Sequence, residues 1–151
     1  MPHAPEVNED IRDLSDGWIV TDGTHSAPLP VPGDVHSALL DAGIISDPYW
    51  RDREMSLDWI HESEWTATRV FDLETKEDGP WTLSFKGIDC VAEVRLNDVL
   101  LGLPRNRFLR HDFDAGHALA AGENRLQVVF RSNSAGAERL AAASPYKVPY
   151  I

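Results

Sequence analysis

The stretch EWTATRVFDL, residues 64–73, decides the fold class, because its side chains alternate with a period of two. In an extended chain every second residue points to the same side. The stretch is rich in β-branched and aromatic residues, which strands favour. The sequence therefore predicts a β-strand whose two faces differ, and the residues on one of these faces are Trp65, Ala67, Arg69 and Phe71.

Further short strands are expected on both sides of this one. Each is a short run of β-forming residues, and turn signals such as Asn97-Asp98 and residues 121–124 separate them. Many short strands with regular turns are typical of an antiparallel sandwich rather than of alternating strands and helices. The expected strands cover residues 18–20, 27–31, 81–88, 90–96, 99–102, 108–115 and 125–132.

One short helix is expected at VHSALLDAG, residues 35–43, where Asp34 can cap the first turn and Gly43 can end the helix. Residues 135–143 also favour a helix, and the prolines that follow enforce an extended segment. The chain stops at Ile151 without a closing loop. We therefore expect a lead-in over residues 1–17 and one sandwich domain over residues 18–151, truncated before its last strands.

The net charge of −11 argues against nucleic acid and anionic membrane surfaces as partners, because both would repel the chain. The N-terminus, MPHAPEVNEDIRDL, has neither the basic region nor the apolar region of a secretory signal. Nowhere does the sequence contain an apolar run long enough to cross a bilayer. A cytoplasmic protein is the expectation.

The sequence predicts neither a metal site nor a catalytic centre of its own. The six histidines lack the H-x-H and H-x-x-x-H spacings of metal ligands, and the single cysteine, Cys90, is expected to pack in the core. No phosphate-binding glycine motif is present, which leaves nucleotide cofactors unsupported. No pair of carboxylates is fixed as the acid and nucleophile of a glycosidase. We expect no catalytic residue and no cofactor in this chain.

The loop DPYWRDREMSLDWI, residues 47–60, is unusual because it combines three large aromatic residues with several charges. Trp59 is expected to plug one end of the sandwich, whereas Tyr49 and Trp50 are equally compatible with a plug and with an exposed platform. An aromatic face beside Asp52, Arg53 and Glu54 is what a sugar ring uses for stacking and hydrogen bonding. The same composition could instead dock a neighbouring domain.

Six motifs stand out along the chain: VPGDVHSALLDAGIISDPYWRDRE, LDWIHESEWTATRVFDL, FKGIDCVAEVRLNDVLLG, NRFLRHDFDA, LAAGENRLQVVFRS and YKVPYI. In their order and spacing they resemble the N-terminal domain of the β-mannosidases of glycoside hydrolase family 2. The resemblance covers residues 18–151 and implies an all-β, galactose-binding-domain-like jelly-roll sandwich with one or two short helices. Such a domain precedes an immunoglobulin-like sandwich and a (β/α)₈ barrel, and the barrel carries the catalytic glutamates.

The resemblance implies that the complete enzyme hydrolyses terminal, non-reducing β-D-mannose residues of β-mannosides with retention, through a covalent glycosyl-enzyme. This chain alone is then inactive, and its partners are the immunoglobulin-like and barrel domains. The loop is expected to reach the rim of the active site, with substrate-binding residues Trp50, Asp52, Arg53 and Glu54. Arg51 and Arg53 stand where glycine and asparagine are frequent in the family.

Two other functions are open from the sequence. A free-standing carbohydrate-binding module could use the same fold, because a fold does not determine a function. It would bind mannosides by itself through Tyr49 or Trp50. A purely structural domain would instead bury its aromatic loop against another protein surface.

Overall fold

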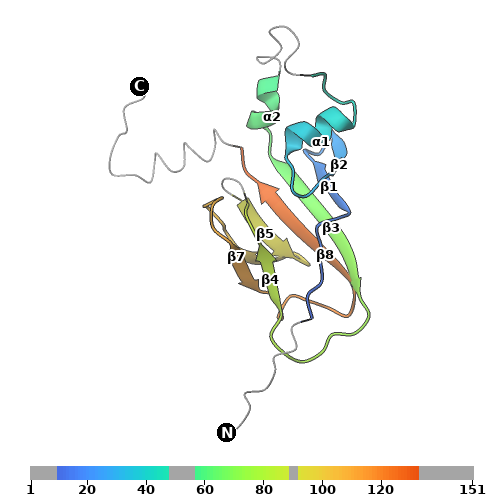
Figure 1. The fold of residues 1–151 in the computed structure, drawn as a ribbon, viewed down its shortest axis with the longest axis vertical. Helices are drawn as coiled ribbons and strands as arrows, with labels where there is room; N and C mark the ends of the chain where they lie inside the picture. The colour runs from blue at the N-terminus through green and yellow to red at the C-terminus, as the bar shows by residue number, and fades with distance from the viewer. Residues whose placement is uncertain (1–9, 48–56, 89–91, 133–151) are drawn as a thin grey trace, which may run out of the picture.

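The computed structural model describes residues 10–47, 57–88 and 92–132, and these form two antiparallel sheets that face each other (Figure 1). The larger sheet has six strands in the order β2-β1-β3-β8-β5-β6, and the smaller sheet pairs β4 with β7. The strands are β1 (Trp18–Thr21), β2 (Ser26–Leu29), β3 (Trp65–Leu73), β4 (Thr82–Phe85), β5 (Ala92–Leu96), β6 (Val99–Gly102), β7 (His111–Asp114) and β8 (Gly122–Phe130). The expected all-β sandwich is confirmed.

The long pair β3 and β8 forms the middle of the larger sheet, with a register that runs from Trp65 opposite Phe130 to Leu73 opposite Gly122. Trp65 is buried on the inner face, and so are Ala67 and Phe71. This alternation confirms the pattern from which the strand was predicted. Inward-facing side chains of the two sheets meet in one core, as expected for packed sheets.

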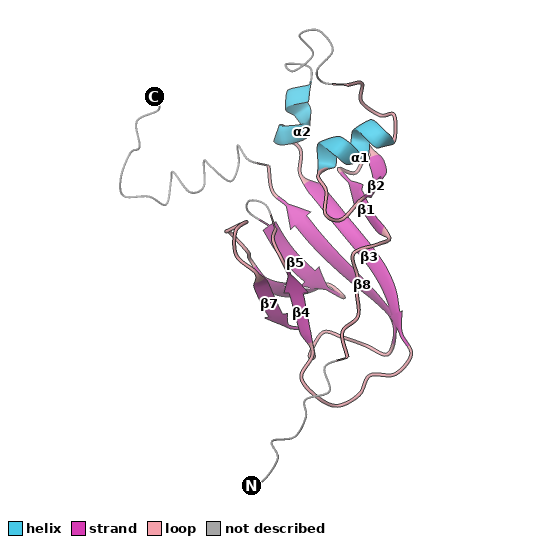
Figure 2. Ribbon diagram, viewed as in Figure 1, coloured by secondary structure: helices cyan, strands magenta, loops and turns pink. Residues whose placement is uncertain are grey.

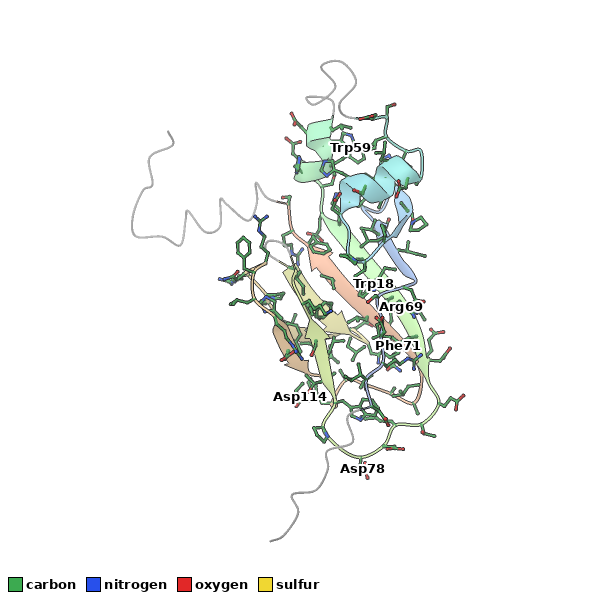
Figure 3. The ribbon with its side chains drawn as sticks, viewed as in Figure 1. Trp18, Trp59, Arg69, Phe71, Asp78 and Asp114 are labelled. Carbon is green, nitrogen blue, oxygen red and sulfur yellow. The ribbon has the colours of Figure 1, made fainter. Side chains whose placement is uncertain are left out.

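Residues 10–17 form an additional layer beside the sheets. Leu14 packs against the core, and its carbonyl oxygen accepts a hydrogen bond of 2.6 Å from Trp18 Nε1. The guanidinium of Arg12 lies 5.6 Å from the centroid of the Phe71 ring and also donates to the carbonyl of Asp72. The segment therefore covers one side of the larger sheet, and Figure 3 shows Trp18 and Phe71 beside it.

Arg69 lies on the same face of β3 as the buried residues, as its register requires, and the N-terminal segment accommodates it. Its guanidinium contacts Asp16 at 3.2 Å, with 18% of the Arg69 side chain exposed. A Cβ atom on Gly17 would come within 3.3 Å of this guanidinium. Gly17, which has a φ of 72°, thus leaves room for the arginine side chain.

Asn124 is the buried polar residue at the start of β8, and its side chain is fully satisfied. Its Oδ1 atom accepts hydrogen bonds from Asn97 Nδ2 at 2.8 Å and from the Ala120 amide at 2.9 Å. Its Nδ2 atom donates to the carbonyls of Ala120 and Gly122 at 2.8 and 3.1 Å. The prediction of a turn over residues 121–124 is partly wrong, because strand β8 already begins at Gly122.

The hairpin predicted at Asn97-Asp98 is confirmed. Both residues have positive φ angles, 50° and 67°, and they join β5 to β6. Asparagine and aspartate tolerate this conformation better than most residues, which suits them to a two-residue turn between strands. The hairpin and Asn124 support each other, since Asn97 also accepts a hydrogen bond of 2.9 Å from the amide of Arg125.

Two short helices lie at one end of the sandwich (Figure 2). Helix α1 (Val35–Asp41) is capped by Asp34, as predicted, through a hydrogen bond of 2.8 Å from the Ser37 amide. Helix α2 (Asp58–Glu62) occupies a stretch that was expected to be loop, because burial of Ile60 stabilises it. No helix within the described ranges is long and apolar enough to cross a membrane.

Several predicted strand boundaries are wrong. Strand β7 begins at His111 rather than at residue 108, because residues 105–110 form an exposed loop. Strand β4 covers 82–85 instead of 81–88, and β2 covers 26–29 instead of 27–31. The predicted helix at 135–143 and the core position expected for Cys90 lie outside the described residues.

Candidate functional site

The residues predicted to contact sugar, Trp50, Asp52, Arg53 and Glu54, lie outside the described residues, as does Tyr49. The structure does describe both ends of their loop. Figure 1 places these ends beside α1 and α2, at the same end of the sandwich. Ile45, just before the loop, is 9% exposed, and Ile60, the last residue of the loop, is 3% exposed. Both ends are therefore anchored in the core.

Aromatic and histidine side chains gather at this end. Trp59 packs against the core, with its ring centroid 6.1 Å from that of Trp65 and 4.8 Å from that of His25. Trp59 thus helps to close this end of the sandwich, as expected. His36 of α1 and His61 of α2 lie 4.8 Å apart between ring centroids, which brings the two helices together.

The turn between β1 and β2 holds His25 in place against Trp59. Asp22 Oδ1 accepts hydrogen bonds from the amides of Thr24 and His25, at 2.9 and 2.6 Å, and Asp22 Oδ2 lies 3.1 Å from His25 Nδ1. Burial raises the pKa of Asp22, but these hydrogen bonds outweigh burial and leave its pKa below the ordinary value. Asp22 is therefore ionised at neutral pH and orients the imidazole.

Sequence spacing could not reveal these ring contacts, because His25, His36 and His61 come from three separate segments. Within residues 10–47, 57–88 and 92–132, no group of three or more metal-binding side chains lies close together. The His25–Trp59 and His36–His61 contacts join the segments on which the ends of the loop rest. Trp65 Nε1 donates to the carbonyl of Ile60 at 2.9 Å, which ties α2 directly to the main sheet.

The displaced pKa values among the described carboxyl groups have structural hydrogen bonds as their cause. Those with clearly displaced pKa values all have lowered ones, and they are Asp13, Asp22, Glu93 and Asp112. These four groups are ionised acceptors of structural hydrogen bonds.

Described residues also line two open pockets. The first, of about 530 Å³, lies at the end of the smaller sheet beside Trp81 and Asp114. The second, of about 590 Å³, lies between the N-terminal segment, β2 and α1, where Trp18 and Pro30 form part of its wall. Neither pocket was predicted from the sequence, because each combines residues from distant segments.

Comparison with known proteins identifies what the chain is similar to. The sequence profile of the family described as "Glycosyl hydrolase 2 galactose-binding domain-like" matches residues 18–150. The chain is 37% identical to the β-mannosidase of Rattus norvegicus over 142 residues, which cover 90% of this chain and 16% of that enzyme. It is 41% identical to the β-mannosidase of Capra hircus over 123 residues, which cover 79% of this chain and 14% of that enzyme.

Two solved structures illustrate what the fold is similar to. The β-D-mannosidase of Dictyoglomus thermophilum superposes with a TM-score of 0.77 and 32% identity, over 87% of this chain and 17% of that one. The exo-chitosanase of Amycolatopsis orientalis superposes with a TM-score of 0.68 and 15% identity, over 77% of this chain and 16% of that one, a likeness in fold alone. The chain thus spans about one sixth of the length of the rat and Dictyoglomus enzymes.

Proposed function

The chain belongs to the glycosyl hydrolase 2 galactose-binding domain-like family, and on that premise we propose that it is the non-catalytic N-terminal domain of a β-mannosidase. The complete enzyme hydrolyses terminal, non-reducing β-D-mannose residues of β-mannosides and retains the anomeric configuration. The observation that carries this proposal is the combined likeness in sequence and fold to β-mannosidases over most of the chain.

In this proposal the domain contributes one loop to the rim of the active site and supports the barrel. Trp50 stacks on the terminal sugar, and Asp52, Arg53 and Glu54 hydrogen-bond its hydroxyl groups. The buried residues at the two ends of the loop, Ile45 and Ile60, support this role because they hold these ends at fixed positions. Fixed ends restrict the conformations open to a loop and so lower the entropic cost of binding a sugar.

The test uses the complete polypeptide encoded by the gene that carries this chain. Its steady-state kinetics on p-nitrophenyl β-D-mannoside are compared with those of Trp50→Ala and of the matched control Arg51→Ala. If Trp50 stacks on the sugar, kcat/KM falls about 10-fold to 100-fold in Trp50→Ala, which corresponds to roughly 1.4–2.7 kcal/mol. The control changes by less than about twofold.

Two further measurements check the remaining parts of the proposal. The 151-residue chain alone is expected to show no turnover, and proton NMR of the first product is expected to show β-mannose, the retained anomer. A complete polypeptide without activity on β-mannosides would contradict the proposed function. Saturable mannoside binding by the isolated chain, abolished by Trp50→Ala, would favour a carbohydrate-binding module instead.

A further inference from the structure

The chain contains three aspartate-glycine pairs, Asp16-Gly17, Asp22-Gly23 and Asp78-Gly79. Such a pair is prone to isomerise to isoaspartate, because glycine has no side chain to shield its amide nitrogen from the neighbouring carboxyl group. The reaction needs a carboxyl carbon and an amide nitrogen that can approach each other. The contacts of each pair in the fold therefore decide where the reaction occurs.

The reaction consumes nothing but water. The amide nitrogen of the glycine attacks the protonated side-chain carboxyl group of the aspartate, a C–N bond forms, and the carboxyl hydroxyl leaves with the amide hydrogen as water. The product is a cyclic succinimide. Water then breaks either the new C–N bond, which restores aspartate, or the original peptide bond, which leaves isoaspartate with the main chain running through the side chain.

In the pair Asp22-Gly23, both reacting groups are held by hydrogen bonds. Asp22 Oδ1 accepts from the amides of Thr24 and His25, Asp22 Oδ2 lies 3.1 Å from His25 Nδ1, and the Gly23 amide donates to Thr21 Oγ1 at 3.0 Å. Burial raises the pKa of Asp22, but its hydrogen bonds leave the pKa below the ordinary value, which disfavours the protonated form that reacts. The fold therefore protects this pair strongly.

The pair Asp16-Gly17 is held less firmly. Asp16 Oδ1 lies 3.2 Å from a guanidinium nitrogen of Arg69, although 88% of the Asp16 side chain is exposed. Gly17 packs closely against the same guanidinium, since a Cβ atom on Gly17 would come within 3.3 Å of it. An ion pair open to solvent is weak. This pair is therefore partly protected.

The pair Asp78-Gly79 lies in the loop between β3 and β4, and both of its residues are exposed. Figure 3 shows Asp78 on the outer side of this loop, away from both sheets. Among the described residues, nothing donates a hydrogen bond to the Asp78 carboxylate, and the Gly79 amide has no acceptor. A Cβ atom on Gly79 would meet nothing within 4 Å. Neither reacting group is restrained.

The loop is nevertheless fixed on both sides of this pair. Lys76 Nζ donates to the carbonyl of Leu119 at 3.0 Å, and Trp81 Nε1 donates to the carbonyl of Glu77 at 3.0 Å. Isomerisation of Asp78 would add one atom to the main chain inside this closed turn. The modification would therefore strain the contact between Trp81 and Glu77.

We propose that Asp78-Gly79 is the site at which isoaspartate accumulates in this protein, and that the fold protects Asp22-Gly23 strongly and Asp16-Gly17 partly. The three pairs share the same intrinsic chemistry, and they differ in the contacts that restrain the carboxyl group and the amide. The inference is independent of the proposed function, because it uses no substrate and no other domain.

The test compares the rates of isomerisation in the folded and the unfolded protein. The complete polypeptide that carries this chain is incubated at neutral pH, either folded or unfolded in guanidinium chloride. Isoaspartate at each pair is then quantified by mass spectrometry after digestion with the endoproteinase Asp-N, which cleaves before aspartate but not before isoaspartate. The ratio of folded to unfolded rate at one pair cancels the effect of its local sequence.

For Asp78 this ratio should be close to unity, within about threefold, because the loop tip leaves both groups free to move. For Asp22 the ratio should be at least about tenfold lower, because several hydrogen bonds must break before the attack. The ratio for Asp16 should lie between these two. The control Asp78→Glu should abolish the signal at its own position alone, because glutamate would have to form a larger ring.

A ratio below about one tenth for Asp78, or a rate for Asp22 equal to that of Asp78 in the folded protein, would overturn the proposal. Incubation in heavy-oxygen water checks the route, because hydrolysis of a succinimide inserts a solvent oxygen, and isoaspartate without that oxygen would refute it. If Asp78→Glu fails to fold, the wild-type ratios decide. A polypeptide inactive on β-mannosides would remove the proposed function and leave these ratios unaffected.

Discussion

Replacing Asn124 by alanine should destabilise the protein more than any substitution of an exposed polar residue. The change removes the four hydrogen bonds of the Asn124 side chain. Because Asn124 is completely buried, the groups that bonded to it lose their partner at a buried site. A hydrogen bond contributes about 1 kcal/mol net, and a buried group left without its partner costs about 1–3 kcal/mol. Because Asn97 keeps its bond to the Ala118 carbonyl, we expect a total loss of about 4 kcal/mol.

This loss would be a large part of the stability of a domain of this size. Urea unfolding of the 151-residue chain, followed by tryptophan fluorescence, measures it, and thermal unfolding should show a decrease in Tm of roughly 10 °C. Asn106→Ala is the matched control, because Asn106 is exposed and its side chain accepts one hydrogen bond from the Phe108 amide. A loss below about 1.5 kcal/mol for Asn124→Ala, or equal losses for the two variants, would refute the view of Asn124 as a buried hub.

Two further substitutions test individual interactions. The hydrogen bond from Arg131, at 2.6 Å, lowers the pKa of Glu93. The ionised Glu93 therefore stabilises the fold above the ordinary pKa of a glutamate, and this stabilisation is lost as the pH falls through the pKa of Glu93 in the folded state. Glu93→Gln should therefore lower the free energy of unfolding by about 1 kcal/mol at pH 7 and by less at pH 3. Urea unfolding at the two pH values measures the difference, and a loss of stability that does not depend on pH would contradict this prediction. Asp34→Ala removes the cap of α1 and should cost about 1 kcal/mol, whereas Asp41→Ala at the other end of the helix should not.

The middle of the fold could be predicted from the sequence because its signals are local. Alternation over residues 64–73 reports a strand with one buried face, and β3 has that face. Asn97-Asp98 reports a two-residue turn because few other pairs accept two positive φ angles. Asp34 indicates a helix start because its carboxylate can accept a hydrogen bond from a backbone amide in the first turn.

Features that depend on tertiary contacts could not be predicted. Helix α2 has no side-chain cap, and its five residues are held by burial of Ile60, which leaves no local signal. Asparagine is common in turns, so the sequence suggested only a turn at Asn124. Its hydrogen bonds to Asn97 in the hairpin and to Ala120 before the strand depend on the folded structure. The start of β7 was misplaced because FLR has strand-like composition while the loop holds it outward.

The candidate site divides in the same way. Its loop was identified by composition and by resemblance, and its binding residues, Trp50, Asp52, Arg53 and Glu54, remain predictions because they lie outside the described residues. The support for that loop, by contrast, comes from contacts between segments. Trp59 could be predicted as a plug from its apolar neighbours, whereas its contact with His25 could not.

The layer formed by residues 10–17 affects how this domain should be cloned. The family match begins at Trp18, which invites an expression boundary at that residue. Such a boundary would delete Leu14, the acceptor for the Trp18 indole, and would uncover Phe71 by removing Arg12. A fragment cut at the family boundary would therefore expose apolar surface and tend to aggregate, whereas one that begins at residue 10 or earlier keeps this cover.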